Sequence, residues 1–130
     1  MEEYWGYHLL LDCRNSPREL VTDRDNLYRF VKQLVKDIDM VAYGEPILEH
    51  FATHDPDKAG WSIIQLIETS NISAHLVDKN GNGYIDVFSC KHFDPADVIE
   101  VVNKFLRPEK IRSHFVVRDA DKEYDAGFPE

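Results

Sequence analysis

The sequence predicts an α+β protein in which two helices cover one face of a mainly antiparallel β-sheet. Two segments carry apolar residues at the helical spacing of three and four positions. Six other segments are short and rich in β-branched and aromatic residues, which is typical of strands. The resulting order is β-α-β-β-β-β-α-β. That order favours a two-layer sandwich, with both helices on the same side of the sheet.

The two helices are expected to begin at recognisable caps. Thr22 is the expected N-cap of the first helix, and Asp25 follows three residues later. The apolar stripe of that helix consists of Leu27, Phe30, Val31, Leu34, Val35 and Ile38. Asp94 and Pro95 predict the start of the second helix, because proline is well tolerated in a first helical turn. The apolar positions of the second helix are Val98, Val101, Val102, Phe105 and Leu106.

The strands are expected in six stretches between turn-rich segments. They are Trp5–Leu11, Val41–Phe51, Trp61–Glu68, Asn71–Val77, Tyr84–Cys90 and Lys110–Arg118. The chain has 130 residues, which corresponds to one domain. We expect this domain to span residues 1–118, followed by an acidic C-terminal tail over residues 119–130.

Composition restricts the class of partner. The net charge of −9 argues against nucleic acid, which requires clustered basic residues, and is compatible with a small cationic substrate. No apolar run reaches membrane-spanning length and the N-terminus does not resemble a signal peptide, so we expect a cytoplasmic protein and no membrane partner. Two cysteines, Cys13 and Cys90, do not make a disulfide framework.

Residues 78–83, DKNGNG, match the opening of a calcium-binding loop. Such a loop needs a bidentate acidic residue at its twelfth position and helices on both sides, but Ser89 stands at that position and the flanks are strand-like. Glycine and asparagine at 81–83 instead favour a hairpin turn. We therefore expect no metal site here.

A hairpin at this point brings His75 alongside the strand that ends at Cys90. An imidazole and a thiol close to the serines of residues 69–73 form a candidate reactive group. A histidine on a strand is also commonly an ordinary polar residue. The segment G-x-S-x-G of a nucleophile elbow does not occur, so a serine hydrolase of that kind is excluded.

Several segments resemble the prokaryotic S-adenosylmethionine decarboxylases, which are made as proenzymes. The matching segments are GWS at 60–62, SNISAH at 70–75 and DVFSC at 86–90, in register without insertions. YHLLLD at 7–12 and DPADVIEVVNKFL at 94–106 are also similar to the family's first strand and second helix. The resemblance covers most of the chain from Gly6 to Arg118.

The resemblance implies self-cleavage and a cofactor made from the chain itself. Ser70 would attack the carbonyl carbon of Thr69, and the chain would split with a pyruvoyl group derived from Ser70. Ser62 and His75 match residues of this processing step. The pyruvoyl group would bind the substrate amine as a Schiff base and act as electron sink, and Cys90 would donate the proton that replaces carbon dioxide.

The resemblance also implies substrate-binding residues and a homodimer. Asp12 would lie near the positive charge of the substrate, Phe51 against the adenine ring and Glu68 beside the cleavage site. The product would serve polyamine, in particular spermidine, biosynthesis. A domain of this size also gains buried area by dimerising.

Two departures from the family pattern leave three functions open. Thr69 replaces the glutamate that precedes the reactive serine, and Lys79 stands where the family has the glutamate that binds the ribose. The chain could be an S-adenosylmethionine decarboxylase with an altered pocket. It could be a pyruvoyl-dependent decarboxylase of ornithine or arginine, which contain no ribose. The third hypothesis is an unprocessed, non-catalytic homologue.

Overall fold

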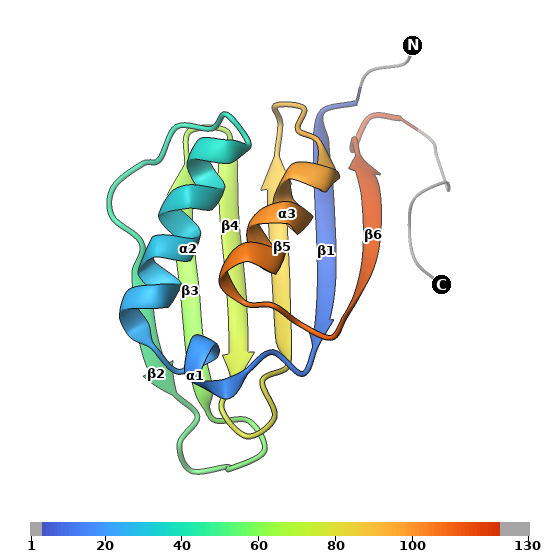
Figure 1. Cartoon of the computed structure of the whole chain (residues 1–130). Helices are drawn as coiled ribbons and strands as arrows, with labels where there is room; N and C mark the ends of the chain where they lie inside the picture. The colour runs from blue at the N-terminus through green and yellow to red at the C-terminus, as the bar shows by residue number, and fades with distance from the viewer. Residues whose placement is uncertain (1–3, 123–130) are drawn as a thin grey trace.

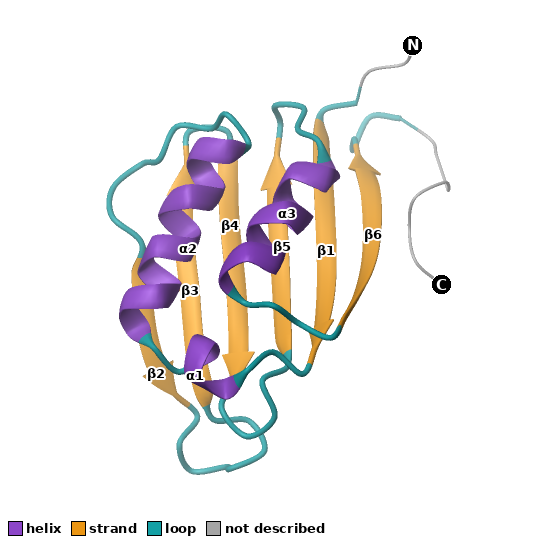
Figure 2. Ribbon diagram, in the orientation of Figure 1, coloured by secondary structure: helices purple, strands orange, loops and turns teal. Residues whose placement is uncertain are grey.

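The computed structural model describes residues 4–122 and contains a six-stranded sheet with the helices on one face (Figures 1 and 2). The strand order is β2-β3-β4-β5-β1-β6, and every pair of neighbours is antiparallel. The elements are β1 (Gly6–Arg14), α1 (Arg18–Val21), α2 (Arg24–Asp37), β2 (Ile47–Phe51), β3 (Gly60–Ile67), β4 (Ser70–Val77), β5 (Gly83–Ser89), α3 (Pro95–Phe105) and β6 (Lys110–Arg118). The predicted fold class and the order of the six strands and two long helices are confirmed.

The hydrophobic core lies between the helix layer and the sheet. The predicted apolar stripe of α2 is buried over its whole length, and so are four of the five positions predicted for α3 and the turn after it. Asn26 ties the helices together, because its buried amide nitrogen donates to the carbonyls of Leu20 (2.9 Å) and Phe105 (3.0 Å). Near β6 the two layers are joined by aromatic contacts of Phe115 with Tyr7 and Phe93.

The start of α2 differs from the prediction by one residue. Asp23, not Thr22, is the N-cap, and its carboxylate accepts hydrogen bonds from the amides of Asp25 and Asn26. The Thr22 hydroxyl instead donates to the carbonyl of Arg18 in α1, a short helix that the sequence did not reveal. A helix of four residues has too little periodicity to be recognised in a sequence.

The predicted strand over residues 41–51 is also shorter in the structure. Only Ile47–Phe51 pairs with β3, and Ala42 makes a single isolated bridge to Ile67. The two parts are separated by Gly44, whose φ is +75°, and by Pro46. Since proline cannot donate to a strand ladder, the turn signal at 44–46 outweighs the β-propensity around it.

The predicted hairpin between β4 and β5 is confirmed. Gly81 in its turn has a φ of +76°, and a Cβ atom at this position would lie 1.9 Å from the carbonyl oxygen of Ser16. Strands rather than helices therefore flank residues 78–82. Among residues 4–122, no group of three or more His, Cys, Asp or Glu side chains is arranged to hold a metal ion.

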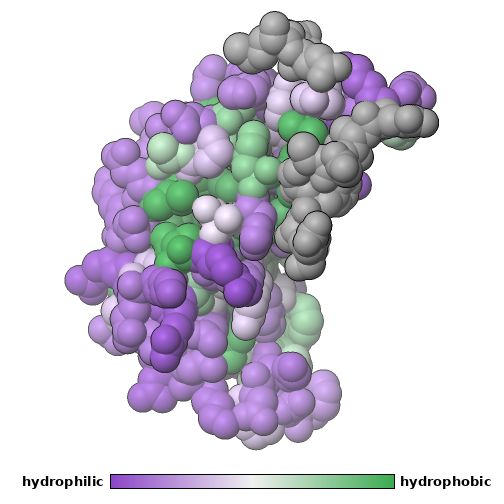
Figure 3. Space-filling view, turned by 90° about the vertical axis from the view of Figure 1, so that its right-hand side faces the viewer, coloured by the Kyte–Doolittle hydropathy of each residue, from purple (hydrophilic) through white to green (hydrophobic). Residues whose placement is uncertain are grey.

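The face of the sheet opposite the helices, here called the open face, exposes several large apolar side chains. By strand alternation and register these are Ile47, Phe51, Ile64, Leu66 and Tyr84, each about half exposed. From the β6 side, a hydrophobic band runs through the middle of the molecule between hydrophilic regions (Figure 3).

No helix in the described part of the chain is long and apolar enough to cross a membrane. Most of the predicted tail, residues 123–130, lies outside the described residues.

Candidate active site

The bond between Thr69 and Ser70 lies at the end of the β3–β4 hairpin. Ile67 pairs with Ser70, so Glu68 and Thr69 form the connecting turn. Ser70 also pairs with Ser89, the last residue of β5. The backbone amide of Cys90 therefore reaches the Thr69 carbonyl and donates to it at 2.9 Å. The backbone of the exposed Cys90 thus lies next to the candidate cleavage bond, and the role of its thiol as proton donor stays a prediction.

Ser70 has an unusual backbone conformation. Its φ is +156°, a value that residues with a Cβ atom rarely adopt. This torsion turns about the N–Cα bond of Ser70, which is adjacent to the Thr69–Ser70 peptide bond. Such outliers are typical of sites where the surrounding structure holds local strain for a function.

The side chain of Thr69 contacts two residues that were not predicted from the sequence, and a third residue holds one of them. The buried hydroxyl of Ser89 donates to the Thr69 hydroxyl oxygen at 2.8 Å. Thr69 in turn donates to the sulfur of Met40 at 3.3 Å. The amide of Lys91 donates to the Ser89 oxygen at 2.9 Å. Only the position of Ser89 next to Cys90 could have signalled this cluster in the sequence.

Ser62 and His75 form a hydrogen-bonded pair on the open face. They are directly opposite each other in the β3–β4 ladder, and Ser62 Oγ lies 2.8 Å from His75 Nδ1. The other ring nitrogen, Nε2, lies 2.9 Å from the carbonyl oxygen of Lys58. Because a carbonyl can only accept, Nε2 carries a hydrogen, and in the neutral ring Nδ1 accepts the Ser62 hydroxyl.

This pair belongs to a row of polar side chains that crosses the whole sheet. The strand registers connect, from β2 to β6, Glu49, Ser62, His75, Tyr84, Asp12 and Arg112. Alternation along the strands directs this row to the open face. We call it the polar row.

The polar row and the cleavage bond are far apart within one chain. His75 lies five residues beyond Ser70 on β4, which corresponds to about 16 Å. Within one chain, Ser62 and His75 therefore do not lie at the bond between residues 69 and 70, and their role in processing stays a prediction. An odd separation also directs side chains to opposite faces of a regular strand, although the φ of Ser70 interrupts that regularity.

The predicted substrate-binding residues divide between the same two places. Glu68 is exposed in the turn beside the cleavage bond. The Phe51 ring lies 6.4 Å from the His75 ring, measured between centroids, and Asp12 belongs to the polar row. The eight predicted residues thus form two groups of four.

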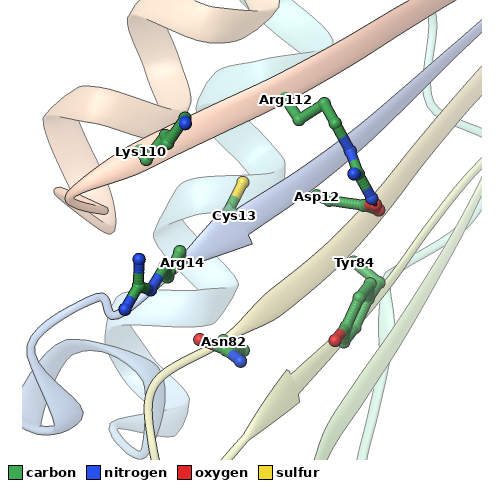
Figure 4. A pocket seen from close by; sticks show the side chains of 7 residues that line it. All are labelled: Asp12, Cys13, Arg14, Asn82, Tyr84, Lys110 and Arg112. Atoms are coloured by element: carbon green, nitrogen blue, oxygen red, sulfur yellow. Dashed lines mark hydrogen bonds and ion pairs between the residues drawn. The ribbon is translucent and has the colours of Figure 1, made fainter.

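Asp12 lines a cavity of about 340 Å³ at the ends of β1, β5 and β6. Figure 4 shows Arg112 reaching across to its carboxylate, and the two groups are 2.8 Å apart. The charge of Asp12 is therefore already paired, and its interaction with a cationic substrate stays a prediction. Cys13 lines the same cavity. Burial, followed by the charge of Asp12, raises the pKa of its thiol to about 12.

The segment that departs from the family pattern holds one ion pair and one contact between a histidine and a carboxylate. Lys79 contacts Asp57, with 2.5 Å between nitrogen and oxygen, and this hydrogen bond raises the pKa of the lysine. Asp78, the nearest carboxylate, contacts His50. The Lys79 ammonium has no acceptor, and Asp78 uses one carboxylate oxygen on His50 while the other, Oδ1, is buried without a partner among the described residues.

Comparison with known proteins identifies the family. The family model described as S-adenosylmethionine decarboxylase matches residues 7–119, which include both groups of candidate residues. The chain belongs to this family. It is a family of decarboxylases, that is, carboxy-lyases, and similar proteins of this family are named as proenzymes.

Individual relatives are similar at low identity over most of their length. An S-adenosylmethionine decarboxylase proenzyme of Methanococcus maripaludis strain C7 is 29% identical over 107 residues, covering 82% of this chain and 83% of the relative. An arginine decarboxylase proenzyme of Aeropyrum pernix is 25% identical over 118 residues, covering 90% and 86%. The solved adenosylmethionine decarboxylase of Aquifex aeolicus VF5 has the same fold, with a TM-score of 0.76, 19% identity and coverage of 95% and 98%.

Proposed function

We propose that this chain is a self-cleaving, pyruvoyl-dependent decarboxylase that acts on S-adenosylmethionine in polyamine biosynthesis. The observation that carries the proposal is the contact between the Thr69 carbonyl and the amide of Cys90. It joins the bond that must be cleaved to the residue that must later donate a proton. Membership of a family of proenzymes supports it further.

The residues at the turn can perform the first step of maturation. The Ser70 hydroxyl oxygen forms a bond to the Thr69 carbonyl carbon, the carbon–nitrogen bond breaks, and the hydroxyl proton passes to the Ser70 nitrogen. During this exchange the Thr69 oxygen gains negative charge, which the Cys90 amide stabilises as a hydrogen-bond donor. Removal of the Ser70 α-proton then releases the ester and splits the chain, and an imidazole such as that of His75 is suited to this.

The mature site requires a carbonyl group and a proton donor. The pyruvoyl group derived from Ser70 supplies the electron sink for loss of carbon dioxide. Cys90 is exposed directly beside that position and can donate the proton to the substrate. No metal is needed for this chemistry.

We propose that a second copy of the chain completes the site. Ser62 and His75 lie about 16 Å from Ser70 in their own chain, so they serve a cleavage bond only across an interface. In a twofold dimer the same surfaces meet in both directions, and each chain can offer its polar row to its partner's turn. The half-exposed Ile64 and Leu66 on the open face provide apolar area for such an interface.

A direct assay of decarboxylation can distinguish the candidate substrates. Carbon dioxide release from S-adenosylmethionine, arginine and ornithine, each labelled in its carboxyl group, distinguishes the proposed activity from its main alternative. Arginine is the second candidate because the Aeropyrum pernix relative is named for it and because Lys79, paired with Asp57, stands at the position of the ribose-binding glutamate. We expect S-adenosylmethionine to be preferred. Preference for arginine would replace the substrate but keep the mechanism, and a chain that is never cleaved would be a non-catalytic homologue.

We also propose a cytoplasmic location. Both cysteines are free thiols, and the proposed role of the exposed Cys90 requires it to remain reduced. Reducing compartments preserve such thiols.

A further inference from the structure

Thr69 is attached to the sheet by its side chain as well as by its backbone. Its hydroxyl oxygen accepts from Ser89 at 2.8 Å, and its carbonyl oxygen accepts from the amide of Cys90 at 2.9 Å. Ser89 and Cys90 are consecutive residues at the end of β5. The two hydrogen bonds therefore hold both the side chain and the carbonyl of Thr69 against one short segment.

Ser89 itself has little freedom to move. Its side chain is fully buried. Its oxygen accepts from the amide of Lys91 at 2.9 Å and lies 2.8 Å from the Thr69 hydroxyl oxygen, to which it donates, and 3.7 Å from the sulfur of Met40. The Thr69 proton is directed to the sulfur of Met40, which lies after α2. Each member of this chain of hydrogen bonds fixes the direction of the next, so the orientation of Thr69 is determined from β5 and from the helix layer together.

We propose that Ser89 is a positioning residue for chain cleavage: its hydroxyl holds the Thr69 side chain so that the Thr69 carbonyl stays on the Cys90 amide and open to the Ser70 hydroxyl. This inference rests on the proposed self-cleavage. It assigns a role to Thr69, which stands where the family pattern has glutamate. The threonine side chain is short and β-branched, so it cannot reach distant partners. Its hydroxyl instead bonds to the buried hydroxyl of Ser89 on the neighbouring strand.

The effect of Ser89 is exerted on the acyl shift, before the chain splits. The shift forms the bond between Ser70 Oγ and the Thr69 carbonyl carbon, breaks the carbon–nitrogen bond and moves one proton from oxygen to nitrogen. Ser89 exchanges no atom in this step. It limits the rotation of the Thr69 carbonyl away from its donor, and loss of such orientation commonly costs an order of magnitude or more in rate.

The test follows cleavage of the freshly made chain by intact-mass spectrometry in Ser89→Ala, Ser89→Thr and Thr69→Val. We expect Ser89→Ala and Thr69→Val to slow fragment formation by roughly tenfold or more, and Ser89→Thr to restore most of the rate because it keeps a hydroxyl. Ser16→Ala is the matched control. Ser16 is also a buried serine, but its hydroxyl has no partner among the described residues, and the variant should cleave at the rate of the parent.

A second readout separates positioning from general loss of stability. Hydroxylamine cleaves an ester but leaves an amide intact, so brief treatment of the uncleaved chain measures the fraction in which the shift has occurred. Ser89→Ala should lower this fraction while its circular dichroism stays that of the parent. The double variant with Thr69→Val should be no slower than Thr69→Val alone, since the two hydroxyls act through each other.

The outcomes distinguish the two proposals. If the parent is never cleaved, the proposed function fails and the role of Ser89 fails with it. If the parent is cleaved and Ser89→Ala keeps its rate and ester fraction, or if the two variants act additively, only the role of Ser89 is overturned. A folded Ser89→Ala with a normal ester fraction but slow splitting would likewise contradict it.

Discussion

At the scale of single residues, the candidate site combines an exposed thiol with neighbouring side chains that are held by hydrogen bonds. Cys90 is exposed, whereas Ser89 beside it is fully buried. The spacing of Ser62, Ser70, His75 and Cys90 made these four residues recognisable in the sequence. The contacts of Thr69 with Ser89 and Met40 were not recognisable, because they depend on the β4–β5 register and on a residue that follows α2.

The Ser62–His75 pair predicts a specific processing defect. His75→Ala should leave the chain uncleaved by mass while the Thr69–Ser70 linkage becomes sensitive to hydroxylamine, because the shift would proceed and the α-proton would stay in place. His114→Ala, on the exposed side of β6, is the control and should cleave like the parent. Splitting of His75→Ala at the parent rate would remove the imidazole from the mechanism.

The two cysteines should react very differently with an alkylating reagent. Burial, then Asp12, raises the pKa of Cys13 from 9.0 to about 12, so its thiol stays protonated and covered at pH 8. Iodoacetamide should therefore add one group to the native chain, at Cys90, and two after unfolding, as counted by mass. Two groups on the native chain would contradict the buried position of Cys13.

The same pKa shift sets the sign of a stability change. Between pH 9 and 12 the unfolded chain loses the Cys13 proton while the folded chain keeps it, so the contribution of this thiol to stability declines as pH rises.

At the scale of elements, long periodic segments and clear turn residues were predictable, and boundaries were less so. The stripes of α2 and α3 and the turn at Gly81 follow from side-chain chemistry that the sequence displays directly. The N-cap of α2 was missed by one position, because Thr22 and Asp23 are both good caps and only the end of α1 decides between them.

That choice of cap gives a direct comparison of two neighbouring variants. Asp23→Ala should lower the free energy of unfolding by about 1 kcal/mol, because two amides of the first turn of α2 lose their acceptor. Thr22→Ala should have a smaller effect, since its hydroxyl only supports the exposed end of α1. Urea denaturation followed by circular dichroism measures both values. A larger loss for Thr22→Ala would reverse the assignment of the cap.

At the scale of the whole molecule, the main result is the separation of the site into two groups at opposite ends of β4. The sequence predicted which residues belong together but not this distance, because position along a hairpin follows from the strand register. The proposed site shared between two copies would reconcile the predicted roles of these residues with the geometry of one chain.

A shared site predicts complementation between two inactive variants. Ser70→Ala lacks the nucleophile and His75→Ala lacks the imidazole, so neither should split when produced alone. When the two are coexpressed, the His75→Ala chain should be cleaved, because its intact Ser70 meets an intact His75 from the other copy. Mass spectrometry distinguishes the two chains. If the coexpressed His75→Ala chain stays as uncleaved as it is alone, a shared site is ruled out.

The central claim is that the peptide bond between Thr69 and Ser70 is broken by the protein itself, and intact-mass spectrometry of the freshly purified chain tests it most directly. Self-cleavage gives two fragments, residues 1–69 and 70–130, the second with a mass lower by one ammonia than simple hydrolysis would give. A chain that stays whole through prolonged incubation, or a second fragment that begins with an ordinary serine, would contradict it.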